Sequence, residues 1–134
     1  MRKFIIHTDG GARGNPGPAG IGVFIQDENG RVLLEHARYI GKTTNNQAEY
    51  TAVIDALHHA EELGADEISF FLDSELVVKQ LNGEYRVKDA ELAQMFLKVH
   101  NARLAFRKVT FTHVRREQNK DADRLANEAM DRGE

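Results

Sequence analysis

The sequence predicts an α/β domain built on a mixed five-stranded sheet with helices on both faces. Three observations support this: three apolar runs at the start, a long amphipathic stretch after them, and short strands that then alternate with helices. The predicted order is β-β-β-α-β-α-α-β-α. With 134 residues, 41% of them hydrophobic, we expect a single domain over residues 1–134 with its own core.

The first three strands are predicted to form an antiparallel meander. Arg2–Thr8 is predicted to be a strand that ends at Asp9. Gly10–Gly20 holds five glycines and both prolines, which is typical of an ordered turn region. Two apolar runs, Gly20–Gln26 and Arg31–Ile40, flank an Asn-Gly pair, and this arrangement is a strong hairpin signal.

The rest of the chain alternates helices with strands. A helix is predicted from about Asn46 to Leu63, because apolar residues recur at helical spacing and Gly64 follows them. Glu67–Leu72 is short and apolar, as in a central strand that is buried on both faces. A short helix, a longer helix, a strand and a closing helix are predicted at Ser74–Leu81, Asp89–Arg103, Arg107–Val114 and Asn119–Asp131.

The composition excludes several classes of protein. No apolar run approaches the roughly 18 residues of a membrane span, and the first one is too short for a signal peptide. The absence of cysteine excludes disulfides, thiolate metal sites and cysteine nucleophiles. We therefore expect a monomeric, cytoplasmic protein with no membrane partner. The net charge of −3 argues mildly against a nucleic-acid partner, although Lys98–Lys120 carries seven Lys or Arg and one acid.

Three carboxylates occupy positions that favour a functional site. Glu49 lies on the apolar stripe of its helix, four residues before Val53, and is therefore directed at the sheet. Asp9 and Asp73 each follow an apolar strand directly, so parallel neighbouring strands would bring both to the sheet edge where α/β proteins bind ligands. The alternatives are a solvated first helical turn for Glu49 and a turn or cap role for each Asp.

A fourth acid is expected from the last helix. Asp121 and Asp123 both flank its apolar stripe, and spacing alone does not choose between them. Carboxylates gathered in one cleft repel each other and raise their own pKa values, which a hard divalent cation relieves. Mg²⁺ takes oxygen ligands and commonly bridges carboxylates to phosphate, so Mg²⁺, or Mn²⁺, is the expected cofactor.

Four segments carry recognisable motifs, in order, at the predicted strand and helix ends: Thr8–Gly20 (TDGGARGNPGPAG), Thr44–Glu49 (TNNQAE), Leu72–Ser74 (LDS) and Asn119–Ala126 (NKDADRLA). Together they resemble the ribonuclease H type I family over nearly the whole chain. The resemblance implies a ribonuclease H-like fold and hydrolysis of the RNA strand of an RNA–DNA hybrid with two divalent metal ions. The products would carry 5′-phosphate and 3′-hydroxyl ends.

The resemblance also implies roles for individual residues. The implied metal ligands are Asp9, Glu49, Asp73 and Asp123, the last chosen over Asp121 because it lies four residues after Asn119. One ion would activate the attacking water and the other would stabilise the leaving oxygen. Implied substrate contacts are Gly10, Gly11, Asn15, Thr44, Asn45, Asn46 and Ser74. The glycines would let backbone approach the substrate closely, and 2′-hydroxyl contacts would distinguish RNA from DNA. For Asn45, capping of its helix is the alternative role.

The chain departs from the family in two places. Many members carry a catalytic histidine in a glycine-containing loop before the last helix, where this chain has His113–Asn119 without glycine. His113 is a candidate for that catalytic role as a proton shuttle, although we favour its interpretation as a strand-end residue. Arg116 is a second catalytic candidate, as an alternative cation near the scissile phosphate. Some members insert a basic helix and loop where this chain has only Asn82–Asp89, which predicts a compact form. The remaining histidines are interpreted as structural or surface residues: His7, His36, His58, His59 and His100.

Three other functions compete with this interpretation. A non-catalytic nucleic-acid-binding module would be favoured by a missing acid, and all four are present. A junction resolvase or integrase-like nuclease shares the carboxylates but lacks the Asn-Asn-x-x-Glu and Gly-Asn-Pro-Gly patterns found here. A Mg²⁺ phosphatase for small phosphoesters is the third. Cleavage of a hybrid compared with single-stranded RNA, duplex RNA and a small phosphoester separates them.

Overall fold

The computed structural model describes residues 1–133, which form one five-stranded sheet with the order β3-β2-β1-β4-β5. The first three strands pair antiparallel, while β4 pairs parallel with β1 and β5 pairs parallel with β4. The predicted mixed sheet is therefore confirmed. The strands are β1 (Lys3–Ala12), β2 (Gly17–Asp27), β3 (Val32–Thr43), β4 (Glu67–Leu72) and β5 (Lys108–His113).

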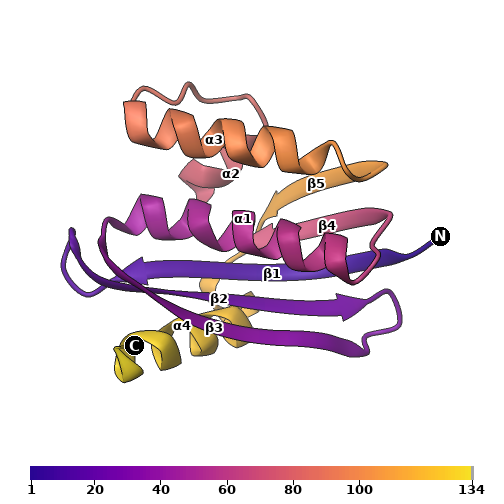
Figure 1. Cartoon of the computed structure of the whole chain (residues 1–134), viewed down its shortest axis with the longest axis horizontal. Helices are drawn as coiled ribbons and strands as arrows, with labels where there is room; N and C mark the ends of the chain where they lie inside the picture. Colours follow the sequence, from indigo (N-terminus) through magenta and orange to yellow (C-terminus); the bar gives the residue numbers. More distant parts are fainter. Residues whose placement is uncertain (134) are drawn as a thin grey trace.

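Helices cover both faces of the sheet, as the sequence predicts. Figure 1 shows α1 and α3 stacked on one face and α4 on the opposite face. The apolar residues of α1 pack on the sheet, and the largest fully buried side chain there is Tyr50, whose hydroxyl donates to Gln80 Oε1 at 2.8 Å. The helices are α1 (Asn45–Glu62), α2 (Glu75–Leu81), α3 (Ala90–Arg103) and α4 (Lys120–Arg132), with a 3₁₀ turn η1 (Arg116–Gln118).

The segment after the first strand differs from the prediction. β1 does not end at Asp9 but continues to Ala12, because its last residues pair with β2 up to Ala12 opposite Ala19. The predicted turn region at Gly10–Gly20 is correspondingly wrong, since only residues 13–16 lie between the two strands. Part of this glycine-rich segment therefore belongs to the sheet, because helices pack closely against its glycines.

Two strand glycines, Gly10 of β1 and Gly22 of β2, allow helices to approach the sheet closely. A Cβ on Gly22 would lie 2.2 Å from the Ala122 carbonyl oxygen of α4, which is far inside contact distance. A Cβ on Gly10 would lie 2.4 Å from the carbonyl carbon and oxygen of Ala48 in α1. The close approach that Gly10 permits is therefore to the helix that carries Glu49, a reason the sequence pattern did not reveal.

The parallel ladder determines where the strand-end acids lie. β1 and β4 are paired from Lys3 opposite Glu67 to His7 opposite Phe71. Asp9 and Asp73 each lie two residues beyond that last pair, so the two strands bring both carboxylates to the same level of the sheet. The predicted meeting of the two acids follows from this register.

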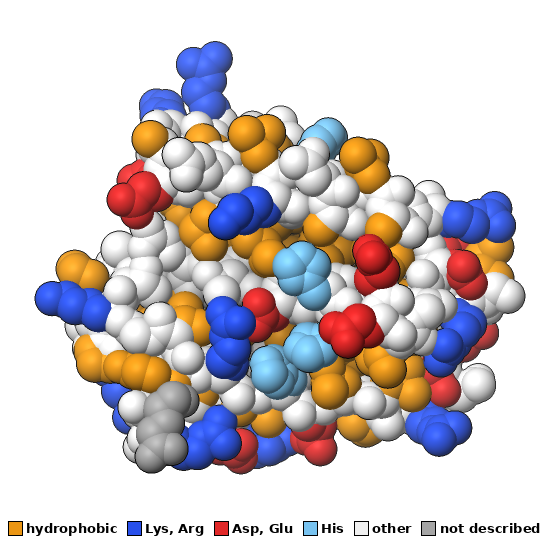
Figure 2. Space-filling model, viewed as in Figure 1, with side chains coloured by type: hydrophobic (Ala, Val, Ile, Leu, Met, Phe, Trp, Pro, Cys, Tyr) orange, Lys and Arg blue, Asp and Glu red, His pale blue; other side chains and the backbone are white. Residues whose placement is uncertain are grey.

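The remaining surface features are ordinary for a folded domain. Figure 2 shows histidine side chains gathered near the middle of the face that α1 covers. The rings of His36 and His59 lie 4.7 Å apart. Elsewhere in the molecule, His7 stacks on Phe71 at 5.2 Å. Only residues 82–89 connect α2 to α3, as expected for the compact form.

None of the helices formed by residues 1–133 combines the length and apolar character that a membrane crossing requires.

Candidate active site

Three carboxylates from separate elements meet at the carboxyl end of β4. Asp9 comes from the middle of β1, Asp73 directly follows β4, and Glu49 lies in the first half of α1. One oxygen of each lies within 4.8 Å of the others. Asp9 and Glu49 are only 9% and 7% exposed, so the alternative of a solvated first turn is wrong for Glu49.

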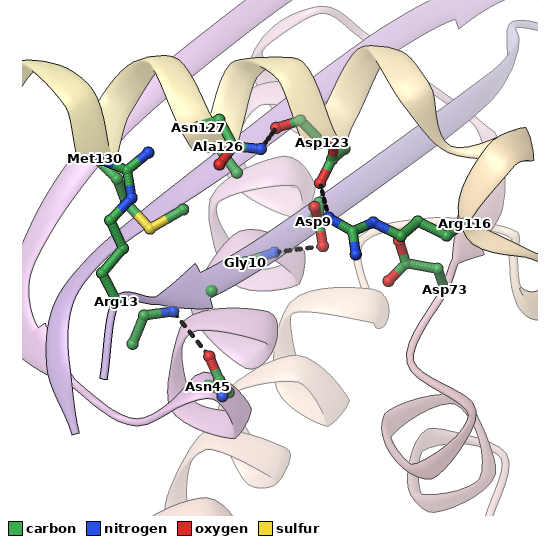
Figure 3. Close-up of a pocket in the computed structure, with 12 residues that line it drawn as sticks. Asp9, Gly10, Arg13, Asn45, Asp73, Arg116, Asp123, Ala126, Asn127 and Met130 are labelled. Atoms are coloured by element: carbon green, nitrogen blue, oxygen red, sulfur yellow. Dashed lines mark hydrogen bonds and ion pairs between the residues drawn. The ribbon is translucent and has the colours of Figure 1, made fainter. Parts of the chain in front are cut away.

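The fourth acid lies at the edge of this group. Asp123 of α4 lines the same open cavity of about 500 Å³ as Asp9 and Asp73, but it is outside the tight group of three. Its Oδ1 lies 3.6 Å from Nη2 of Arg116. Figure 3 shows the side chains of Asp9, Asp73, Asp123 and Arg116 pointing toward one another. Asp121 instead lies 3.7 Å from Arg124 on the surface.

Burial and mutual repulsion dominate the electrostatics of the carboxylates. Burial, with the Asp73 charge added, raises the pKa of Asp9 to about 7. Burial also raises the pKa of Glu49 well above its usual value, and the neighbouring Asp9 acts in the same direction. A single backbone donor, the Gly10 N–H, reaches both Asp9 Oδ1 at 3.0 Å and Glu49 Oε1 at 3.2 Å. Two acids held this close need a further positive charge to ionise together.

A divalent cation fits this arrangement. Glu49 Oε2 is buried and has no hydrogen-bond partner among residues 1–133, although buried polar atoms are normally paired. The donor set is oxygen only, which matches the preference of Mg²⁺ and Mn²⁺. The unpaired oxygen and the three converging carboxylates thus give the site the chemistry of a hard-metal centre.

The metal-free carboxylates are expected to cost stability, which Asp9→Asn tests. The Asp9 pKa is about 7 in the folded protein against an ordinary 3.8. Below about pH 4 the carboxyl is neutral in both states. Between about pH 4 and pH 7 only the unfolded state loses the proton, so stability falls across this window, and above about pH 7 the loss is complete. The asparagine side chain is neutral throughout. We expect the variant in EDTA at pH 8 to be more stable by about 1–2 kcal/mol, roughly 3–8 °C in Tm.

Thermal unfolding in EDTA at pH 5 and at pH 8 measures this effect. The advantage of Asp9→Asn over the parent should grow between the two pH values, and Mg²⁺ at pH 8 should reduce it by stabilising the parent. An equal difference in Tm at both pH values would contradict the expectation.

A buried asparagine adjoins the carboxylates. Asn119 is 1% exposed, and its Nδ2 donates to the Thr8 carbonyl at 2.9 Å and to Asp73 Oδ2 at 3.4 Å. Burial raises the pKa of Asp73, while the Asn119 hydrogen bond acts in the opposite direction. In the sequence, Asn119 serves only as the motif residue that locates Asp123. The missed signal is that Asn119 lies on the buried stripe of the last helix, three residues before Ala122.

The turn after β1 is bonded to the start of α1. The Asn45 side-chain oxygen accepts from the Ala12 N–H at 2.8 Å, and the Asn15 oxygen accepts from the Asn45 N–H at 3.0 Å. Thr44, not Asn45, caps α1, because the Thr44 hydroxyl accepts from the Gln47 N–H at 3.2 Å. The capping role considered for Asn45 is therefore wrong, and its side chain joins the turn to the helix.

The other expected substrate-contact residues lie around the carboxylates. Gly10, Gly11 and Asn45 line the cavity that holds Asp9, while Asn15, Thr44 and Asn46 line a neighbouring polar cavity of about 340 Å³. Ser74 directly follows Asp73, and its hydroxyl caps α2 by accepting from the Val77 N–H at 3.3 Å.

His113 and Arg116 occupy different positions relative to the cavity. His113 is the last residue of β5, as predicted for a strand-end histidine, and its Nδ1 lies 3.9 Å from Glu75 Oε2. Arg116 lies in η1, its side chain is 79% exposed, and it lines the cavity that Asp9, Asp73 and Asp123 share. Of the two, only Arg116 lines that cavity.

Comparison with known proteins gives consistent matches over this fold. Residues 7–129 match a family model described as reverse transcriptase-like. A ribonuclease HI of Halobacterium salinarum is 43% identical over 125 residues, which is 93% of this chain and 63% of the relative. The crystal structure of LC11-RNase H1 in complex with an RNA/DNA hybrid has a TM-score of 0.92 and 48% identity, covering 96% of this chain and 97% of that one.

Some relatives are much longer than this chain. A bifunctional protein of Mycobacterium tuberculosis is 43% identical over 130 residues, covering 96% of this chain but 36% of the relative. The chain thus spans about a third of the length of that mycobacterial protein. The matched part covers nearly all of this chain.

Proposed function

Because this chain belongs to the ribonuclease H type I family, we propose that it is an endonuclease that hydrolyses the RNA strand of RNA–DNA hybrids. The observation that carries the proposal is the meeting of Asp9, Glu49 and Asp73 within 4.8 Å at an open cavity that Asp123 also lines. Products with 5′-phosphate and 3′-hydroxyl ends are expected.

The proposed cofactor is a pair of Mg²⁺ ions, with Mn²⁺ as a possible substitute. Asp9, Glu49, Asp73 and Asp123 would hold them, supported by the buried, unpaired Oε2 of Glu49 in the described chain. The chemistry supplied by bound ions would be activation of a water for attack on phosphorus and stabilisation of the leaving 3′ oxygen. The carboxylates contribute the negative charge that offsets the ions and the fixed positions that align them.

Residues around the carboxylates are proposed to orient the hybrid. Asn15 and Asn45 are linked through the Asn45 N–H, so the turn after β1 and the start of α1 present one preformed surface. We propose that Asn15, Asn45 and Asn46 touch the strands in the minor groove and that Thr44 helps to seat a DNA phosphate. Gly10, Gly11 and Ser74 complete the proposed contact set. Contacts to 2′-hydroxyls would favour the RNA strand.

One cleavage assay with matched substrates tests the proposed function. An RNA–DNA hybrid, single-stranded RNA, duplex RNA and a small phosphoester are each incubated with the protein over a titration of Mg²⁺ and of Mn²⁺. We expect metal-dependent cleavage of the RNA strand in the hybrid, with the other substrates cut far more slowly. Binding of the hybrid without cleavage at any metal concentration would instead indicate a non-catalytic binding module.

Arg116 is proposed to stabilise negative charge at the scissile phosphate. Arg116 lines the cavity with its Nη2 3.6 Å from Asp123 Oδ1, and an arginine does not deprotonate at neutral pH, so its contribution is electrostatic. We expect Arg116→Ala to lower kcat by about 10–100-fold. His113→Ala should lower kcat by less than about threefold, because His113 does not line the cavity.

The matched control for Arg116 is its neighbour Arg115. The Arg115 side chain is 76% exposed and lies 3.4 Å from Glu117, outside the cavity lining. Arg115→Ala should keep kcat close to that of the parent at saturating hybrid and Mg²⁺. Turnover of Arg116→Ala equal to that of the parent would rule out the assigned role.

The domain organisation, oligomeric state and location of the protein are also proposals. We propose one catalytic domain over residues 1–134 that acts as a monomer in the cytoplasm. Size-exclusion chromatography with light scattering tests the monomer, and a dimer at micromolar concentration would contradict it.

A further inference from the structure

Asn119 has the position of a helix cap without the function of one. It directly precedes α4, and an asparagine there usually accepts a hydrogen bond from a backbone N–H of the first turn. Its side chain makes no such bond. It points into the protein instead, where it is 1% exposed and where, among residues 1–133, its Oδ1 has no hydrogen-bond partner. Giving up the cap and burying an unpaired oxygen both cost stability.

Asn119 makes hydrogen bonds at the supports of three carboxylates, two through its side chain and one through its backbone carbonyl. Both hydrogens of Nδ2 are used, one for the carbonyl of Thr8 at 2.9 Å and one for Asp73 Oδ2 at 3.4 Å. Thr8 is the residue directly before Asp9 in β1. The backbone carbonyl of Asn119 accepts from the Asp123 N–H at 3.1 Å. One residue therefore joins β1, the end of β4 and α4 at the point where their acids converge.

The chemistry of an amide suits this position. A neutral donor orients a carboxylate without cancelling its charge, so the carboxylate remains available to a cation. A lysine or arginine in the same place would compete with the metal ions for Asp73. An aliphatic residue would leave the Thr8 carbonyl without its donor.

From these contacts we propose that Asn119 is a positioning residue. It fixes Asp73, and the part of β1 that carries Asp9, relative to α4 so that the carboxylates can bind metal. The inference relies on the proposed function for the identity of the reaction. The geometric part, the orientation of Asp73, is independent of any substrate. Asn119 itself touches no reacting atom in this assignment.

Two substitutions separate the hydrogen bonds from the packing. Asn119→Ala removes the amide and leaves a cavity, while Asn119→Leu keeps a similar volume without a donor. For both we expect kcat for hybrid cleavage to fall by about 10–100-fold, and the affinity for Mg²⁺ measured by calorimetry without substrate to weaken by about tenfold. KM for the hybrid should change by less than about threefold. Crystal structures should show a different side-chain rotamer for Asp73.

Asn82→Ala is the matched control. Asn82 Nδ2 also donates to a strand carbonyl, that of Phe111 at 3.1 Å, but at the end of α2 and outside the cavity lining. It should lose stability while keeping Mg²⁺ affinity and kcat. An equal loss of Mg²⁺ affinity in Asn82→Ala would reduce Asn119 to a structural role and overturn the proposal.

Two further results would also overturn it. One is a folded Asn119→Leu protein with Mg²⁺ affinity and kcat within twofold of the parent. The other is an unmoved Asp73 in the crystal structure of a variant that has lost activity. If the parent itself failed to cleave hybrids, the proposed function would fail, while Mg²⁺ calorimetry and the Asp73 rotamer would still decide the role of Asn119.

Discussion

Asp73→Asn is expected to lower Mg²⁺-dependent cleavage of a hybrid by about a thousandfold or more, with little change in the fold. Asp73 follows β4 directly and converges on Asp9 and Glu49 within 4.8 Å. Asparagine has nearly the same shape and still offers an oxygen to the Asn119 amide. The substitution removes one negative charge from the group that would hold the ions. We therefore expect the metal-dependent cleavage rate to fall while the fold is kept.

Initial rates over a Mg²⁺ titration, with far-UV circular dichroism and thermal unfolding, measure the effect. Asp55→Asn is the control, because the Asp55 side chain is only 13% exposed and pairs with Arg38 at 3.2 Å, away from the cavity. It should retain the parent's rate within about twofold. Near-normal turnover by purified, folded Asp73→Asn would refute the assignment of Asp73 and with it the proposed mechanism.

Gly22→Ala is expected to give the largest loss of stability, about 3 kcal/mol or more, or roughly 10–15 °C in Tm. The added Cβ would lie 2.2 Å from the Ala122 carbonyl oxygen and 2.8 Å from the Ala126 nitrogen. Both are backbone atoms of a helix, so no side chain can move aside. α4 must shift away from β2, and hybrid cleavage should fall as well, because α4 carries Asp123.

The comparison variant is Gly41→Ala in β3. Gly41 has a φ of +79°, and a Cβ there would meet nothing within 4 Å. Its substitution should cost only the left-handed backbone strain, about 1–2 kcal/mol, without loss of cleavage. The two variants are compared by urea unfolding and by initial rates. A Gly22→Ala protein as stable as Gly41→Ala would show that α4 does not depend on this contact.

The order of elements and three of the four acids could be predicted from local pattern. Helical periodicity is enough to direct Glu49 at the sheet, and an apolar strand that ends in an acid is enough to pick out Asp73. Strand pairing then determines the position of Asp9, since the β1–β4 register brings it level with Asp73. These predictions succeed because the signals lie within a few residues of the site they describe.

The predictions that failed depend on partners far away in the chain. Turn statistics assign a glycine-rich segment to a loop, but Gly10 is needed for contact with Ala48 in α1. The role of Asn119 was missed for a similar reason, because its side chain reaches Thr8, 111 residues earlier in the chain. Tertiary packing overrides the local preference in both cases.

The unequal lengths of the two ladders on β1 have a thermodynamic consequence. Pairing of β1 with β4 stops at His7, whereas pairing with β2 continues to Ala12. At Asp9, β1 is therefore still paired with β2 but no longer paired with β4. Asp9 is thereby fixed on a hydrogen-bonded strand beside an opening between strands. A cation that binds Asp9 in this opening between β1 and β4 does not have to order a loop. Its association therefore avoids the conformational entropy penalty that a flexible binding loop would impose.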